Sequence, residues 1–141
     1  MLKQVSLEEV RLIAFDLARQ HLSFDEPMPD FDTRFPNILE SCLATPFQQV
    51  FGHSPYPNLI AQASVLFYLL VKNHPFQNGN KRIAIVVLLV FLAKHNKWVR
   101  IDRDRLYKFT LWVAESKAKD MSFVLPSIQA FISTHLVPFP S

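Results

Sequence analysis

The sequence predicts an all-α fold, a helical bundle around a central buried helix with a short extended or β-hairpin flap. Several segments place apolar residues at the three- and four-residue spacing of amphipathic helices. The run Ile83–Ala93 is apolar on every side, so other elements must surround it. Half of the 141 residues are hydrophobic and 19% are charged, which suits one packed domain over residues 1–141.

The first predicted element is a helix from about Leu7 to His21, where apolar residues follow helical spacing. Ser6 and Glu9 have the spacing of a capping box, in which each side chain accepts a hydrogen bond from the other residue's backbone. The next segment, Ser23–Pro36, contains three prolines and four acidic residues and is predicted to be a loop.

A short helix over Asn37–Leu43 is expected next. The segment Thr45–Gly52 has β-type residues and no helical period, which favours an extended edge or a hairpin, the predicted flap. Asn58 is a good N-cap for an apolar helix that runs to Lys72. A second apolar helix is predicted from near Asn80 to about His95. Its β-branched residues are also compatible with a strand, but its length favours a helix.

Short elements complete the chain. Trp98–Ile101 is expected to be a strand, and Asp102 or Asp104 is expected to cap a helix that ends near Ser116. The last predicted helix covers Pro126–His135, with the proline in its first turn.

Composition excludes several classes of protein. The lone Cys42 cannot form an internal disulfide and is expected to be a small buried residue in a protein of a reducing compartment. The N-terminus lacks the apolar core of a signal peptide, and the longest apolar run is shorter than the roughly 20 residues that span a bilayer. We therefore expect a soluble cytoplasmic protein. The net charge is +3, and the cations between residues 94 and 108 alternate with Asp102 and Asp104, which favours a solvated face over nucleic-acid binding.

A polar loop between the two apolar helices carries the candidate chemistry. It runs His74-Pro75-Phe76-Gln77-Asn78-Gly79-Asn80-Lys81-Arg82. It ends at a helix N-terminus, where backbone N–H groups and the helix dipole attract anions. Gly79 lets a phosphate approach the backbone closely, and Lys81 and Arg82 add positive charge. The loop therefore has the parts of a phosphate-binding site.

His74 begins the same loop and can accept a proton at neutral pH. A base opposite a phosphate site is the minimum set for moving a phosphoryl-type group to a hydroxyl. Pro75 restricts the backbone beside His74, and Phe76 is expected to anchor the loop in the core. Each of these residues alone is common in surface turns; their order together indicates function.

The order His-Pro-Phe-x-x-Gly-Asn-Lys-Arg resembles the Fic/Doc family motif. Similarity extends outward to Leu39-Glu40-Ser41, Ala44-Thr45-Pro46-Phe47-Gln48, Phe51-Gly52 and Tyr56-Pro57. The resemblance implies an all-α Fic/Doc fold in which the helix after the motif is central. It implies that His74 is the base and that Gly79, Asn80 and Arg82 bind phosphates of ATP. Phe76 belongs to the same nucleotide-binding loop.

Lys81 stands where AMP-transferring members have a second glycine, as in the Doc (death on curing) branch. That branch implies a toxin that moves phosphate from ATP to a hydroxyl of elongation factor Tu, inhibits translation and is neutralised by a Phd-type antitoxin. Phosphoryl transfer and AMP transfer to a Ser, Thr or Tyr hydroxyl both stay open. No inhibitory Ser/Thr-x-x-x-Glu-(Gly/Asn) string occurs, so restraint is expected from another chain.

Asn78 departs from the family, which has Asp or Glu at this position as a magnesium ligand. An amide is a poorer ligand for Mg²⁺ than a carboxylate. Three alternatives follow: the metal is held mainly by ATP phosphates with a weak Asn78 contact, activity is weakened, or the protein is a catalytically impaired module that binds a nucleotide or a partner protein. Catalysis is favoured, because His74, Lys81 and Arg82 would otherwise have no use.

Overall fold

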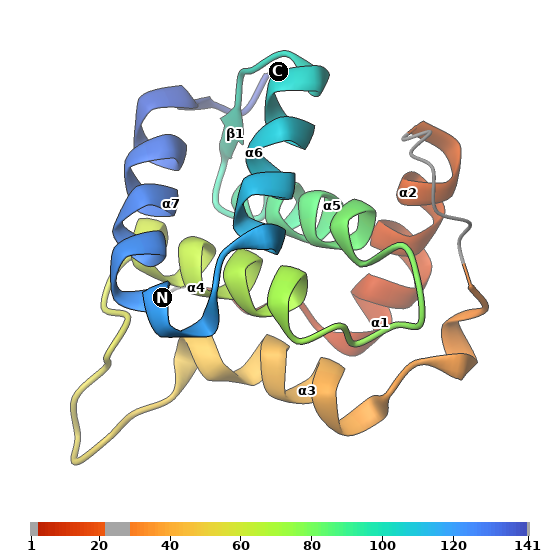
Figure 1. Cartoon of the computed structure of the whole chain (residues 1–141), viewed down its shortest axis with the longest axis horizontal. Coiled ribbons are helices and arrows are strands. Elements are labelled where there is room, and N and C mark those ends of the chain that lie inside the picture. Colours follow the sequence, from red (N-terminus) through yellow and green to blue (C-terminus); the bar gives the residue numbers. More distant parts are fainter. Residues whose placement is uncertain (1–2, 22–28, 141) are drawn as a thin grey trace.

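A computed structural model describes residues 3–21 and 29–140, and this part of the chain is mostly helical (Figure 1). The helices are α1 (Leu7–Glu9), α2 (Phe15–His21), α3 (Pro36–Ala44), α4 (Leu59–Lys72), α5 (Asn80–Ala93), α6 (Arg103–Glu115) and α7 (Met121–His135). Two short strands, β1 (Lys97–Val99) and β2 (Leu136–Pro138), pair antiparallel. The all-α prediction is confirmed.

The first helical region follows the predicted boundaries. Ser6 Oγ accepts a hydrogen bond from the Glu9 N–H at 3.1 Å, and Glu9 Oε1 accepts one from the Ser6 N–H at 2.9 Å. This is the expected capping box. A five-residue π-helical segment, Val10–Ala14, joins α1 to α2. Residues 23–28 of the predicted loop lie outside the described residues. Beyond them, Phe31–Thr33 forms a 3-10 turn and α3 begins at Pro36.

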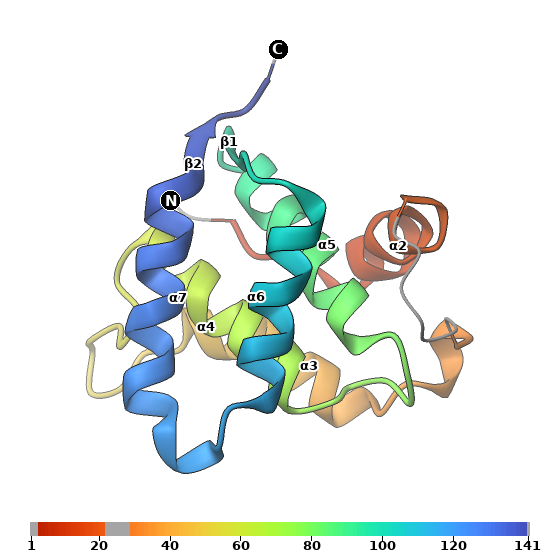
Figure 2. The ribbon, with the colours of Figure 1, turned by 45° about the horizontal axis from the view of Figure 1, so that its top comes forward.

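The central helix α5 lies between α6 and α2 and packs on α4 (Figure 2). Every residue from Arg82 to Leu88 is buried. Full burial of one Leu, Ile or Phe side chain contributes about 1.5–3 kcal/mol, so this helix supplies a large part of the core. The expectation that an all-round apolar helix is surrounded by neighbours is confirmed. None of the described helices is long and apolar enough to cross a bilayer.

The flap differs from the prediction at its start. Thr45–Phe47 forms a 3-10 turn rather than an extended strand, because the Thr45 hydroxyl donates to the Ser41 carbonyl at 2.7 Å and continues the helical path of α3. Pairing is limited to one antiparallel bridge between Val50 and His53. Phe51, at the tip between them, is 98% exposed. We call residues 48–57 the flap.

The C-terminal helix was predicted to begin at Pro126, and that prediction is wrong. α7 begins at Met121, so Pro126 lies inside the helix. The buried residues Val124, Ile128 and Ile132 follow helical spacing, and the pattern therefore begins upstream of the proline. A proline here removes one helical hydrogen bond, and the burial of this face offsets that loss.

The remaining C-terminal elements are close to expectation. Asp102 caps α6 by accepting a hydrogen bond from the Arg105 N–H at 3.3 Å, so Asp104 is not the cap. The predicted strand Trp98–Ile101 occurs as Lys97–Val99. Its partner β2 was not predicted.

Candidate functional site

The motif loop joins the end of α4 to the start of α5, and Gly79 makes the turn into α5. Gly79 is the N-cap of α5 and has a φ of +73°. An L-residue in this left-handed region costs roughly 1–2 kcal/mol, which explains why glycine is needed here. Asn80, Lys81 and Arg82 then form the first turn of α5. N–H groups of a first helical turn point out of the helix end toward a bound anion.

Phe76 anchors the loop, as expected from the sequence. Its side chain is 1% exposed. The ring centroid lies 5.6 Å from that of Phe15 and 6.1 Å from that of Phe31. An N-terminal helix and the segment before α3 therefore both hold the loop in place.

Asn80 closes the loop from the other side. Its Oδ1 accepts a hydrogen bond from the Phe76 N–H at 2.9 Å, and its Nδ2 donates to the Phe76 carbonyl at 2.9 Å. The side chain is 5% exposed. Buried hydrogen bonds of this kind are costly to break, so Asn80 fixes the backbone that carries His74.

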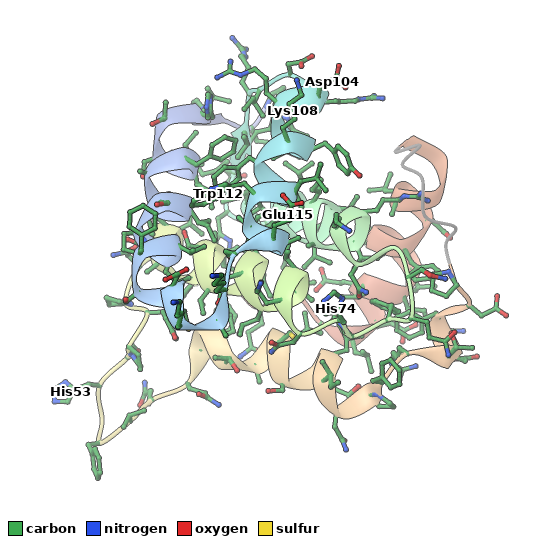
Figure 3. The ribbon with its side chains drawn as sticks, in the orientation of Figure 1. His53, His74, Asp104, Lys108, Trp112 and Glu115 are labelled. Atoms are coloured by element: carbon green, nitrogen blue, oxygen red, sulfur yellow. The ribbon has the colours of Figure 1, made fainter. Side chains whose placement is uncertain are left out.

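His74 is exposed and lies at the α4–α5 connection (Figure 3). Its φ is +50°, which is unusual for a residue other than glycine and costs on the order of 1–3 kcal/mol. The following residue, Pro75, is buried, and its carbonyl accepts a hydrogen bond from the Phe35 N–H at 2.8 Å. The His74 Nδ1 atom lies 3.4 Å from Asn80 Nδ2. The loop thus holds an accessible imidazole next to the first residue of α5.

Two cations occupy the first turn of α5. Arg82 is buried and Lys81 is half-buried. The dipole of a helix disfavours cations at its N-terminus, so a bound anion would favour this pair. The predicted site residues His74, Phe76, Asn78 and Gly79 are brought together with this turn by one continuous segment. Their roles toward a nucleotide stay predictions.

Asn78 precedes Gly79 and is half-buried. Among residues 3–21 and 29–140, no cluster of three His, Cys, Asp or Glu side chains could hold a metal ion. At position 78 the loop therefore offers a magnesium ion a neutral amide in place of a carboxylate, while its cations and its helix end suit phosphate. The donor set fits ATP phosphates, and it fits Mg²⁺ where those phosphates supply most of the oxygen ligands.

Sequence reasoning missed Lys72, the last residue of α4. Its ammonium donates hydrogen bonds to the Ala114 carbonyl at 3.1 Å and to the Ser116 carbonyl. These carbonyls lie at the C-terminal end of α6, where a cation is favoured. A lysine at the end of an apolar helix can cap a helix C-terminus, but the partners of Lys72 lie more than 40 residues away in the sequence.

Cys42 is buried beside the loop, as predicted. Burial raises the pKa of its thiol to about 11, although a hydrogen bond with the Asn73 side chain opposes this change. The thiol is therefore protonated at neutral pH and is a poor nucleophile. Its place in the molecule is structural.

A Fic/DOC family model matches residues 4–92, which include the motif loop and nearly all of α5. The chain belongs to the Fic/DOC family. Within that family it is Doc-like: it is 33% identical over 67 residues to Toxin Doc of Mycolicibacterium smegmatis. The aligned part covers 48% of this chain and 52% of that protein, so the chain spans about half the length of this relative. No solved structure matches the chain.

Proposed function

We propose that this protein is a Doc-like, toxin-type transferase that moves a phosphate or AMP from ATP to a hydroxyl of a target protein. One observation carries the proposal. The His74 imidazole is exposed, and its Nδ1 atom lies 3.4 Å from Nδ2 of Asn80, the first residue of α5. A proton acceptor and a phosphate-binding end are therefore adjacent, which is the arrangement that group transfer to a hydroxyl needs.

In this proposal the first turn of α5 binds the phosphates. Backbone N–H groups at Gly79 and Asn80, together with Lys81 and Arg82, stabilise the negative charge that develops during transfer. Magnesium supplies further charge neutralisation when bound, with Asn78 as a weak contact. Phe76 and the Asn80 side chain act by holding this backbone in one conformation.

His74 supplies the proton-accepting group. It takes the proton of the target hydroxyl while the hydroxyl oxygen forms a bond to phosphorus. The bond from phosphorus to the bridging oxygen breaks, and its electron pair leaves with ADP in phosphoryl transfer or with pyrophosphate in AMP transfer. The exposure of His74 supports this role, because a protein hydroxyl can reach the ring.

The resemblance to Doc supports two further parts of the proposal. The target is elongation factor Tu, whose modification would inhibit translation in the cytoplasm. The restraining partner is a Phd-type antitoxin. An apolar groove of about 760 Å³ along the middle and C-terminal part of α5 supports a partner site away from the motif loop. Exposed apolar residues Ile13 and Leu17 line one side of it.

A second candidate function is a catalytically impaired module that binds a nucleotide or a partner protein. The amide at Asn78 favours this candidate, because it removes the loop's carboxylate. Nucleic-acid binding has weaker support. Lys94, one of the cations that suggested it, is paired with Glu9 at 2.6 Å.

Labelled ATP separates these candidates. Incubation with bacterial lysate and magnesium should label a protein, and γ-labelled against α-labelled ATP distinguishes phosphoryl from AMP transfer. His74→Ala should abolish the label. His53→Ala is the matched control, because His53 is an exposed histidine on the flap and lies away from His74 (Figure 3). Nucleotide binding with no label from either ATP would support the impaired module instead.

A further inference from the structure

We propose that the Asn80 side chain fixes the tautomer of His74, so that Nδ1 is the proton-accepting nitrogen and Nε2 carries the ring proton. Asn80 would then be a positioning residue that acts through His74. This inference rests on the proposed transferase function for its catalytic meaning. The tautomer itself follows from hydrogen bonds around Asn80 and can be measured without any activity.

The orientation of the Asn80 amide is settled by its two contacts with Phe76. A backbone N–H can only donate, so the atom that faces the Phe76 N–H at 2.9 Å must be the oxygen. A backbone carbonyl can only accept, so the atom that faces the Phe76 carbonyl at 2.9 Å must be the nitrogen. A flipped amide would place its N–H donor against the Phe76 N–H and its oxygen against the Phe76 carbonyl, so the flipped orientation is excluded.

The Asn80 Nδ2 atom also presents an N–H donor to the His74 imidazole. A primary amide nitrogen carries two hydrogens, and the Phe76 carbonyl takes one of them. His74 Nδ1 lies 3.4 Å from Asn80 Nδ2. An amide nitrogen can donate but cannot accept a hydrogen bond. A hydrogen bond between these two atoms needs a lone pair on Nδ1, so an unprotonated Nδ1 is the form that this contact selects. The neutral ring therefore has its proton on Nε2.

Burial holds the Asn80 amide in this orientation. Asn80 is 5% exposed, and both of its polar atoms are engaged with the loop backbone. Rotating the amide to present its oxygen to His74 would break two buried hydrogen bonds, each with a net contribution of about 0.5–1.5 kcal/mol and a larger cost if left unmade. The amide is thus held in place by Phe76, and His74 adapts to it.

The consequence concerns which ring atom performs the transfer. Nδ1 is the nitrogen next to the first residue of α5, where the phosphates are proposed to bind. A separation of 3.4 Å is longer than the usual 2.7–3.2 Å, so the target hydroxyl can replace Asn80 as the partner of Nδ1 at small cost. The hydroxyl proton then passes to Nδ1, its oxygen bonds to phosphorus, and the leaving group departs with the bonding electron pair.

The test is the ¹⁵N spectrum of the imidazole rings in the full chain, recorded through two-bond ¹H–¹⁵N correlations at about pH 9, where an ordinary imidazole is neutral. His74 is assigned from the signal that His74→Gln removes. The wild-type ring should show an unprotonated Nδ1 and a protonated Nε2. An Nδ1–H tautomer in the wild type would overturn the inference, and the measurement needs His74→Gln only for the assignment.

Asn80→Asp sharpens the test. The carboxylate keeps an acceptor for the Phe76 N–H but replaces the donor at Nδ1 by an oxygen, so the ring should change to the Nδ1–H form. Asn78→Asp adds the same charge to the same loop and should leave the His74 tautomer unchanged. A folded Asn80→Asp protein with the wild-type tautomer would contradict the proposal. In the labelling assay, Asn80→Asp should lose at least about 100-fold in kcat, the usual range for a misplaced general base.

The two proposals fail separately. If a target protein is labelled but the wild-type ring is Nδ1–H, the tautomer inference is wrong and the transferase function stands. If the ring is Nε2–H in the wild type and Nδ1–H in Asn80→Asp but no protein is labelled by any ATP, the transferase function is wrong and the control of the tautomer by Asn80 stands.

Discussion

The ammonium of Lys72 donates a hydrogen bond to the carbonyl of Ser116, the C-cap residue of α6, and so ties the end of α6 to the last residue of α4. A second hydrogen bond from the same ammonium to the Ala114 carbonyl at 3.1 Å strengthens the link. Two helices of the bundle therefore end at one cation, two residues before His74.

Replacing Lys72 should measure this link. Lys72→Met keeps the aliphatic chain but leaves two carbonyls without their donor, and it should lower the free energy of unfolding by about 1–2 kcal/mol. Urea denaturation gives the value. Lys108→Met removes the same charge from an exposed position on α6 and should change stability little. Equal losses in both variants would show that Lys72 acts only as a surface charge.

Phe76 should contribute strongly to the stability of the protein. Phe76→Ala removes a ring that is 1% exposed and packed on two other rings, so we expect a loss of about 3–5 kcal/mol in the free energy of unfolding. Phe123→Ala is a suitable control, because Phe123 is 66% exposed and should cost far less. Thermal and urea denaturation of both variants would check this. Similar losses would contradict the assignment of Phe76 as the anchor.

Asn78→Asp should strengthen magnesium dependence in the labelling assay. It restores the carboxylate that the family has at this position, so half-maximal labelling should need less Mg²⁺ than in the wild type. Gln77→Glu places the same charge on the neighbouring exposed residue and should not lower the requirement. If both variants respond alike, the effect comes from general charge rather than from a ligand at position 78.

The ion pair of Glu9 with Lys94 predicts a pH dependence of stability. Burial alone would raise the pKa of the Glu9 carboxyl, but hydrogen bonds from Lys94 and Ser6 outweigh burial and hold that pKa below its ordinary value of 4.5. A depressed folded pKa means that the stabilisation is present above about pH 4.5 and is lost as the pH falls through the folded value.

Glu9→Gln is the variant that tests this pH dependence, because its amide oxygen can still accept from Ser6 while the charge is gone. Its urea midpoint should lie below that of the wild type at pH 7, and the gap should narrow at about pH 3. Glu8→Gln is the control, since the Glu8 side chain is 64% exposed in its pair with Arg11 and should show little gap at either pH. A gap that is constant with pH would exclude the ion pair as its cause.

A substitution in the groove beside α5 should remove neutralisation by an antitoxin and leave the transferase activity intact. Ile13 lines the groove and is 45% exposed, so Ile13→Asp should fold normally, keep the labelling activity and escape neutralisation by a co-expressed Phd-type antitoxin. Leu12→Asp is the control, because Leu12 is 56% exposed and does not line the groove. Growth of cells that express both proteins would report the result, and rescue of both variants alike would exclude this groove.

Local signals predicted the elements around the loop well. Asn58 supplies a capping oxygen, and the helix that it caps ends at Lys72 as expected. Gly79 marks the turn into α5, and the apolar run that follows is long enough to exclude a strand. Where a cap, a glycine and an unbroken pattern agree, the sequence alone defines the element.

Distant contacts explain what the sequence could not predict. The strand β2 forms because Leu136 pairs with Val99, which is far away in the sequence. Nothing in the sequence near Leu136 indicates a strand. The positive φ of His74 is held by Pro75, Phe35 and Asn80 together, although the residue before a proline ordinarily prefers extended backbone. The candidate site residues were visible in the motif, but the hydrogen bonds that orient them required the fold.

The tip of the flap shows that this protein does not use its most stable turn. Phe51 and Gly52, between the bridged residues Val50 and His53, both have positive φ values of 51° and 77°, as the two central residues of a type I′ turn do. Asparagine is the favoured residue at the first of these positions, and phenylalanine there costs roughly 1–2 kcal/mol. Replacing Phe51 by asparagine would therefore relieve this strain, so the stability of the turn does not account for the exposed ring.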